Sequence, residues 1–190
     1  MRVPVPSTRA AAVAAAVLVA AAVGLAGCAT GGPADAPGAG PTAGAPGTAV
    51  EVPPLHPSVD DWPATLLEVV DADGTAHPVA VRVADTDERK AHGLMEVPRV
   101  PAGAGMWFPY DGDRTGGFWM KGTETDLSIA WVDAAGVIVA TADMTVCRAD
   151  PCEVYEPGAT YRAALEVPLG WFEARGIGVG DRVIEAPVGG

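Results

Sequence analysis

The stretch from Ala29 to Pro57 most limits what this chain can fold into. It consists mainly of alanine, glycine, proline and threonine, holds no lysine or arginine, and shows no apolar periodicity. Such a segment cannot bury enough apolar surface to offset the entropy lost on folding, so it is expected to be a flexible tether. The packed core is therefore expected within residues 58–190, a length that suits one domain.

The chain begins like a targeting segment. Arg2 and Arg9 give a basic start, an alanine- and valine-rich run follows, and Leu25-Ala26-Gly27-Cys28 ends it. This layout resembles a bacterial lipoprotein signal, in which the leader is cut before the cysteine and the sulfur carries a lipid. The resemblance implies a signal peptide over residues 1–27 and a lipidated cysteine with its tether over residues 28–57. An uncleaved anchor is the alternative, but the apolar run is shorter than the ~20 residues that a spanning helix needs.

The charge of the chain excludes one class of partner. Twelve basic and 24 acidic residues give −12, and removing Arg2 and Arg9 with the leader leaves 10 − 24 = −14. An acidic protein is repelled by nucleic acid phosphates and by anionic lipid headgroups. We therefore expect no nucleic acid partner. Attachment to the membrane is expected through the lipid on Cys28, which places the domain at the extracytoplasmic face of the cell membrane.

Two further cysteines, Cys147 and Cys152, lie close together in the sequence. Outside the cytoplasm such a pair is most simply a disulfide. The alternative is a metal site, which needs about four ligands. The three histidines, His56, His77 and His92, show no ligand spacing around the pair. We therefore predict a disulfide and expect neither a metal nor a cofactor.

Short strand signals dominate the rest of the chain. Segments rich in β-branched and aliphatic residues predict strands. These strands are 65–70, 79–83, 106–108, 117–121, 127–132, 137–142, 161–167 and 182–185. Asp71-Ala72-Asp73-Gly74 and Asp133-Ala134-Ala135-Gly136 predict hairpin turns. In the strand 127–132, apolar residues alternate with Ser128 and Ala130, which predicts a half-buried strand.

Helix signals are few. The stretch 85–93 has capping and acidic residues at its start, Arg89 and Lys90 later, and a terminal glycine. Gly170–Arg175 predicts one or two further turns, closed by Gly176. Together these elements predict a mainly β (α+β) domain with two short helices, built as a small barrel or a sandwich.

Several short motifs are more specific than the strand and helix signals. In order they are Asp87-Glu88-Arg89, Gly93-Leu94-Met95, Gly105-Met106-Trp107-Phe108, Phe118-Trp119-Met120-Lys121 with Thr123, the cysteine pair with Tyr155, Leu165-Glu166-Val167, Gly170 and Gly180-Asp181. In this order and spacing they resemble the domain-of-unknown-function 192 family (DUF192). The resemblance covers roughly residues 79–183 and implies a compact, mostly β domain, often exported. It implies no known reaction.

The chain also departs from the pattern of that family. The family usually has Phe-Trp-Met-Lys-Asn-Thr, whereas Gly122 replaces the asparagine here. The family then usually has Pro-Leu-Asp, where this chain has Asp126-Leu127-Ser128. If the asparagine and aspartate belong to a site, that site is altered in this chain.

The candidate ligand site is Trp119, Lys121, Thr123 and Asp126. On a strand, Trp119 and Lys121 share a face. A lysine packed by aromatic rings loses hydration, so it could hold an anion or act as a nucleophile. The alternatives are an edge lysine that blocks strand pairing and, for the acidic residues that follow, a solvated loop.

Two functions follow from these features. The first is a lipid-anchored extracytoplasmic binding or accessory domain, whose partner is an envelope protein or a small ligand. The second is an envelope enzyme of the hydrolase type that uses Lys121 with the nearby carboxylates of Glu124 and Asp126. Neither a phosphate loop nor a nucleophile elbow appears in the sequence, and no reaction can be assigned.

Overall fold

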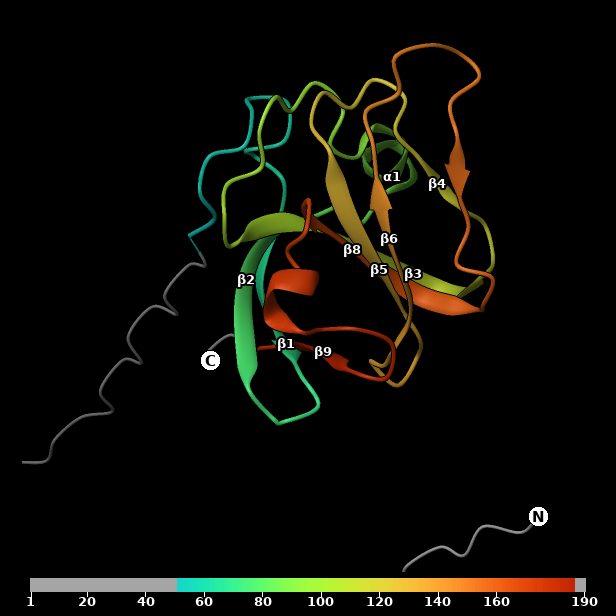
Figure 1. Ribbon diagram of the computed structural model, residues 1–190. Coiled ribbons are helices and arrows are strands. Elements are labelled where there is room, and N and C mark those ends of the chain that lie inside the picture. Colours follow the sequence, from blue (N-terminus) through green and yellow to red (C-terminus); the bar gives the residue numbers. More distant parts are fainter. Residues whose placement is uncertain (1–50, 187–190) are drawn as a thin grey trace, which may run out of the picture. The chain divides into compact units, whose positions relative to one another are not determined.

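The computed structural model of the chain describes residues 51–186 (Figure 1). The predicted leader, Cys28 and most of the predicted tether lie outside these residues. The described elements are β1 (Ala64–Val70), β2 (Ala76–Val83), α1 (Asp87–His92), β3 (Ala104–Arg114), β4 (Phe118–Trp119), β5 (Leu127–Val132), β6 (Ile138–Met144), β7 (Val154–Tyr155), β8 (Tyr161–Pro168), the 3₁₀ turn η1 (Glu173–Arg175) and β9 (Arg182–Glu185). The protein is therefore mainly β, as predicted.

Seven strands form one sheet in the order β6-β5-β8-β3-β2-β1-β9, and β4 pairs with β7 in a separate two-stranded sheet. Neighbouring strands are antiparallel except β2 and β3, which run parallel. A parallel pair needs a crossover connection, and here the crossover contains α1. Strand β8, late in the sequence, lies between β3 and β5 and joins the two halves of the large sheet.

Both predicted hairpins are present. The amide of Asp71 donates to the carbonyl oxygen of Thr75 between β1 and β2, and the amide of Asp133 donates to the carbonyl oxygen of Val137 between β5 and β6. Gly74 and Gly136 have positive φ angles of 84° and 79°. A glycine adopts such angles without a steric cost, which is why these turns could be recognised from sequence.

A closed barrel, one of the two predicted architectures, is not formed. The edge strands β6 and β9 approach each other where Val137 and Arg182 form one isolated bridge, and the described sheet remains open. A two-layer sandwich is not formed either, because the second sheet has only two short strands, β4 and β7.

The prediction of two helices is also wrong, since residues 51–186 contain one α-helix, α1. The second predicted helix is reduced to the single 3₁₀ turn η1, which ends at Gly176 in a left-handed conformation. Trp171 and Phe172, just before this turn, are buried in a hydrophobic cluster with strand residues such as Leu165. The left-handed conformation of Gly176 ends the segment after this single turn.

Strand β5 was predicted to be half-buried, and this is wrong because all six of its residues are buried. Each face of the sheet has its own hydrophobic cluster. Ile129 and Trp131 belong to one cluster, and Ala130 and Val132 belong to the other. The first cluster also contains Val52 and Leu55, so packed residues extend into the segment that the sequence suggested as tether.

Candidate functional site

A carboxylate lies in the middle of the large sheet. Glu166 on β8 faces Met106 on β3 and Ile129 on β5 in the strand register. Its side chain is only 5% exposed. Among residues 51–186, no hydrogen-bond donor or basic side chain pairs with this carboxyl. Burial alone raises the pKa of Glu166 to about 8, because a charged carboxylate loses its hydration there.

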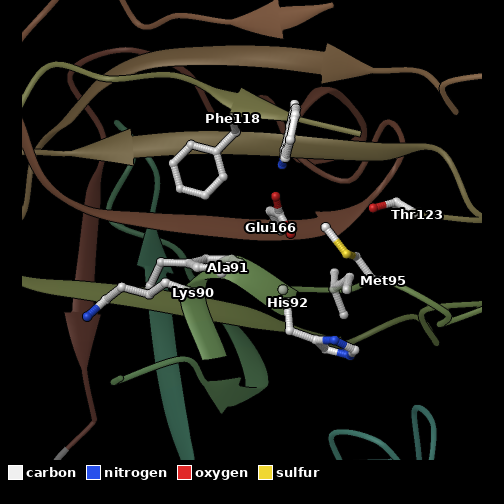
Figure 2. A pocket seen from close by; sticks show the side chains of 11 residues that line it. Lys90, Ala91, His92, Met95, Phe118, Thr123 and Glu166 are labelled. Atoms are coloured by element: carbon white, nitrogen blue, oxygen red, sulfur yellow. The ribbon is translucent and has the colours of Figure 1, made fainter. Parts of the chain in front are cut away.

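This carboxyl opens into a small pocket. The pocket has a volume of about 40 Å³ and is lined by α1 and the turn after it, by β3, by β4 and by Glu166 itself. The lining residues are Lys90, Ala91, His92, Gly93, Leu94, Met95, Phe108, Phe118, Trp119, Thr123 and Glu166. Figure 2 shows the Glu166 carboxyl and the Thr123 hydroxyl turned toward the same space. The imidazole of His92 points away from Glu166 in this view.

Helix α1 forms one wall of the pocket because both of its ends are fixed. The hydroxyl of Thr86 accepts a hydrogen bond from the amide of Arg89 and caps the start. At the other end, Gly93 with φ of 54° lets the chain leave the helix, and its amide donates to the carbonyl oxygen of Arg89. The chain then turns so that Met95 forms a bridge with Thr123.

Two of the four predicted site residues, Trp119 and Thr123, line this pocket. Thr123 is buried, whereas Trp119 is 51% exposed and lies at the rim. Phe118, their neighbour, packs edge-on against Phe108 with the ring centroids 5.1 Å apart. The aromatic motif thus supplies part of the pocket wall and part of the core.

Lys121, the third predicted residue, does not line the pocket. Its ammonium group lies 5.6 Å from the centroid of the Trp119 ring, so the two side chains are neighbours, but Lys121 lies in the turn after β4 and not on the strand that was predicted over 117–121. The Lys121 side chain is 51% exposed to solvent. Its Nζ also pairs with Asp150 at 3.5 Å, and such exposed pairs contribute at most ~1 kcal/mol.

Asp126, the fourth predicted residue, has a local role. Its carboxylate accepts a hydrogen bond of 2.7 Å from the amide of Val146. The contact connects the loop before β5 to the segment after β6. Asp126 is not among the residues that line the Glu166 pocket.

Glu166 itself was absent from the sequence-based site. The sequence did contain a signal for it. Residues 161–167 read Tyr-Arg-Ala-Ala-Leu-Glu-Val, a strand in which one acidic residue stands among apolar neighbours. An acidic residue inside a largely apolar strand segment is a candidate for a functional site, although strict alternation alone would place Glu166 on the same face as Arg162.

A comparison with known protein families identifies the family of this chain. The model of the DUF192 family (Uncharacterized ACR) matches residues 68–184. The chain belongs to the DUF192 family. The match covers every strand of the large sheet at least in part, from β1 to β9, and includes Glu166. No curated protein matches the chain.

Solved structures support the DUF192 fold. A protein from Sinorhizobium meliloti 1021, whose description suggests a transcription regulator, has 22% identity and a TM-score of 0.62, and the match covers 65% of this chain and 95% of that protein. A protein of unknown function from Novosphingobium aromaticivorans DSM 12444 has 23% identity and a TM-score of 0.63, with coverage of 75% and 99%. At these identities the likeness concerns the fold alone.

At two positions where this DUF192 chain departs from the family pattern, the structure shows what the residue present does. Gly122 has φ of 71°, and its carbonyl oxygen accepts a hydrogen bond of 3.0 Å from the amide of Glu96. Asparagine also tolerates this left-handed conformation better than most residues do. Ser128 is buried on β5 and connects three parts of the fold through its hydroxyl.

The disulfide that was predicted between Cys147 and Cys152 is present, with 5.5 Å between the Cα atoms. The bond closes a short loop between β6 and β7. On the chain-entropy model a loop of this length stabilises the fold by about 2 kcal/mol. Strand β7 pairs with β4 through the register of Tyr155 with Phe118 and of Val154 with Trp119. The loop therefore restrains the strand that neighbours the rim of the pocket.

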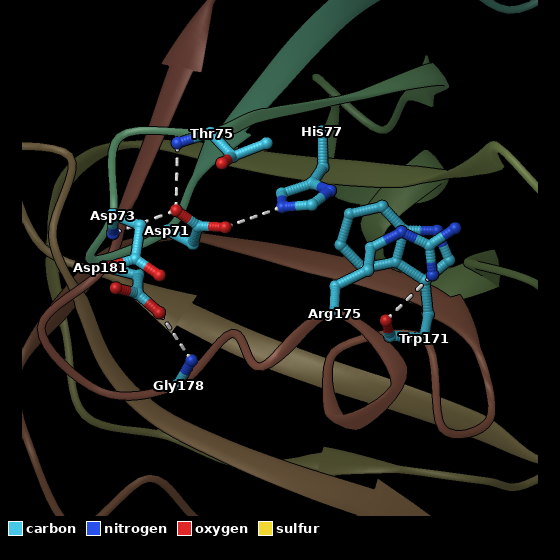
Figure 3. Close-up of polar contacts among 8 residues, drawn as sticks. All are labelled: Asp71, Asp73, Thr75, His77, Trp171, Arg175, Gly178 and Asp181. Atoms are coloured by element: carbon cyan, nitrogen blue, oxygen red, sulfur yellow. Dashed lines mark hydrogen bonds and ion pairs between the residues drawn. The ribbon is translucent and has the colours of Figure 1, made fainter.

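A second group of polar and aromatic residues, on the other side of the sheet, has a structural role in this DUF192 domain (Figure 3). The Asp71 carboxylate pairs with His77 Nε2 at 2.9 Å and accepts hydrogen bonds from the amides of Asp73 and Thr75. These contacts, with His77 foremost, lower the pKa of Asp71. The guanidinium of Arg175 stacks 4.2 Å from the Trp171 ring centroid. These contacts stabilise the hairpin and η1, although the buried indole Nε1 of Trp171 has no hydrogen-bond partner among residues 51–186.

Two kinds of feature are missing from the described residues: a membrane-spanning helix and a cluster of metal ligands. Within residues 51–186, no helix is long and apolar enough to span a bilayer. The same residues contain no group of three or more His, Cys, Asp or Glu side chains arranged to hold a metal ion.

Proposed function

We propose that this protein is a binding domain that a lipid on Cys28 holds at the extracytoplasmic face of the membrane, and that its ligand enters the Glu166 pocket. One observation supports the binding function above all others. Among residues 51–186 Glu166 is buried without a partner, and its carboxyl opens into a pocket that is accessible from outside. Burying such a group costs free energy unless a ligand supplies the missing hydrogen bonds.

The position of Glu166 in the sheet favours a role in function over a role in stabilising the fold. An apolar residue at this position would pack against Met106 and Ile129 without a desolvation cost. The fold therefore gives up stability at this site, as proteins often do where they bind or react. The mixed lining of Thr123 and aromatic rings fits a small-molecule site, which is mostly apolar with a few polar groups.

The location rests on two features. The sequence Leu25-Ala26-Gly27-Cys28 after an apolar run is typical of a lipoprotein leader, and the disulfide is typical of an oxidising compartment. An acyl chain on the cysteine explains membrane attachment without a spanning helix, and two or more chains would make it stable.

Two other functions have less support. An envelope hydrolase built on Lys121 would need that lysine near a carboxylate in a pocket, whereas Lys121 is exposed and pairs with Asp150. A role in transcription, which the description of the Sinorhizobium protein suggests, conflicts with the charge of −14 expected for the mature chain, because phosphates repel an acidic surface.

Binding can be tested by thermal unfolding of the purified chain with a panel of envelope amines, sugars, peptides, anions and divalent metals. A ligand that binds only the folded state raises the unfolding midpoint by mass action. We expect at least one class to raise it in the wild type and not in Glu166→Gln. Glu173→Gln is the matched control, because it makes the same substitution in η1, at a residue that does not line the Glu166 pocket. If no class acts through Glu166, the binding function is refuted.

The anchor is tested separately by fatty-acid labelling in cells that express the full chain. Label is expected on the wild-type protein, which should fractionate with membranes. The Cys28→Ala variant should carry no label. An unlabelled wild-type chain would disprove the anchor and leave the pocket proposal to its own test.

A further inference from the structure

Given the proposed binding function, we infer that the Glu166 pocket takes the end of a primary amine, with the ammonium group at the Glu166 carboxylate and its short carbon stem along the aromatic rim. The ligand class is thus a small cation that carries N–H donors. Three independent properties of the pocket lead to this assignment.

The first property is charge. The two basic side chains that line the pocket come from α1, and neither reaches Glu166. Lys90 Nζ donates to the carbonyl oxygen of Asp85 at 3.1 Å and lies 5.0 Å from the Tyr110 ring centroid. Figure 2 shows the end of Lys90 and the ring of His92 directed away from the carboxyl. Residues 51–186 therefore supply no cation to an ionised Glu166, whose positive partner must come from the ligand.

The second property is the chemistry of the lining. Phe108, Phe118 and Trp119 present aromatic surface to the pocket, and aromatic faces attract cations and repel anions. The Thr123 hydroxyl adds an acceptor for a second N–H group (Figure 2). An anionic ligand would meet the Glu166 carboxyl and find no cation directed at it. The acidic chain as a whole also attracts cations.

The third property is size. A volume of about 40 Å³ holds roughly three water-sized groups, since one group needs about 10–15 Å³ on this measure. This space admits an ammonium group with one or two carbons. A bulkier head, such as a sugar ring or a quaternary ammonium group, is expected to fit less well. Trp119, 51% exposed at the rim, offers apolar surface for the rest of the stem.

Binding of an ammonium group should release the proton of the Glu166 carboxyl. The empty pocket holds Glu166 in its neutral form at pH 7, because the pKa lies at about 8. The ligand pairs with the carboxylate, so R–NH₃⁺ enters and the Glu166 proton leaves to solvent. Lys90 and His92 on α1 and Tyr110 on β3 are the other titratable groups around the carboxyl. Affinity should therefore rise about tenfold per pH unit between about pH 6 and about pH 8.

The test uses propylamine hydrochloride as the probe and the purified full chain, with binding followed by NMR shifts of the Trp119 indole and by calorimetry. Tetramethylammonium chloride has the same charge without N–H donors, and propionamide has N–H donors without charge. We expect propylamine alone to bind, with proton release and tightening toward pH 8. Glu166→Gln should weaken binding about tenfold or more, and Glu173→Gln should leave it unchanged.

The other outcomes separate this inference from the proposed function. If propionamide or another neutral compound binds through Glu166, or if propylamine binding weakens as pH rises, the pocket is a binding site for a neutral group and the amine assignment is wrong. Equal shifts with tetramethylammonium would show general attraction of cations and would also overturn it. If no compound of any class binds through Glu166, the proposed function fails together with this inference.

Discussion

The hydroxyl of Ser128 on β5 donates its hydrogen to the carboxylate of Asp143 on β6. The same oxygen accepts a hydrogen bond of 2.8 Å from the amide of Gly170, just after β8. Ser128 is only 1% exposed. One hydroxyl therefore connects β5, β6 and the turn after β8. The DUF192 pattern usually has an aspartate at this position.

Ser128→Ala removes both hydrogen bonds and leaves the amide of Gly170 without this partner. We expect the free energy of unfolding to fall by about 1–3 kcal/mol. Ser128→Asp, which restores the usual family residue, should also destabilise this chain, because it places a second carboxylate beside Asp143. Chemical denaturation of the wild type and both variants measures these effects. A stability equal to wild type in Ser128→Ala would contradict the role given to the hydroxyl.

The stability of the ligand-free protein should depend on pH through Glu166. Its pKa in the folded state is about 8 and its ordinary value is 4.5, so the folded state binds more protons between these values. The contribution of Glu166 to the free energy of unfolding should therefore be highest below about pH 4.5. It should fall by up to about 1.4 kcal/mol per pH unit between there and about pH 8.

Glu166→Gln has no such titration, so its stability should exceed that of the wild type increasingly as pH rises from about 5 to about 8. Denaturation at several pH values compares the two proteins, with Glu173→Gln as the control for an exposed glutamate. Parallel pH profiles for the wild type and Glu166→Gln would show that the carboxyl is not desolvated.

Gly105 on β3 permits the close approach of β8. A Cβ atom at this position would lie 2.4 Å from the carbonyl oxygen of Glu166 and 3.1 Å from Cγ1 of Val167. Because β8 is central, the strands must separate or the chain must misfold, and Gly105→Ala should cost about 3 kcal/mol or more. Gly112→Ala on the same strand meets no atom within 4 Å and serves as the control. Equal thermal midpoints for the two variants would contradict this prediction.

The hairpin between β1 and β2 should loosen at acidic pH. The pKa of Asp71 is lowered by His77 and by the amides of Thr75 and Asp73. Its contribution to stability is therefore present above its ordinary value of 3.8 and is lost as pH falls through the lower folded value. Asp71→Ala should speed amide hydrogen exchange of Thr75 at neutral pH.

Asp73→Ala is the control for the hairpin, because its backbone amide, and not its carboxylate, contacts Asp71. The difference in exchange between Asp71→Ala and the wild type should shrink as the pH falls through the lowered pKa of Asp71 and its carboxylate is protonated. A difference that persists in acid would assign the effect to side-chain packing instead.

The local parts of this fold could be predicted from sequence. The bounds of β5 and β9 agree with the predicted strands, and both hairpin turns are where the aspartate and glycine residues indicated. These features depend on neighbours along the chain. The order of strands in the sheet could not be predicted, because the pairing of β8 with β3 and β5 depends on contacts between distant residues. Strand β7 has two residues and gives no periodic signal.

The candidate site was predicted in part for the same reason. Trp119 and Thr123 belong to one short motif, and both line the pocket. Lys121 and Asp126 are as close in sequence, but Lys121 lies in the turn after β4, where it pairs with Asp150, and the carboxylate of Asp126 accepts a hydrogen bond from Val146. Glu166 comes more than 40 residues later, and only the register of β8 brings it beside the aromatic motif.

The central place of β8 also sets an order of events during synthesis. Until residues 161–168 have emerged, the strands on either side can form only separate hairpins and fragments, because β8 supplies the hydrogen bonds that unite them. The pocket cannot exist before that moment, since its carboxyl arrives on the same strand. A chain delivered across a membrane with its N-terminus first would therefore stay open to chaperones and proteases until nearly all of it has passed.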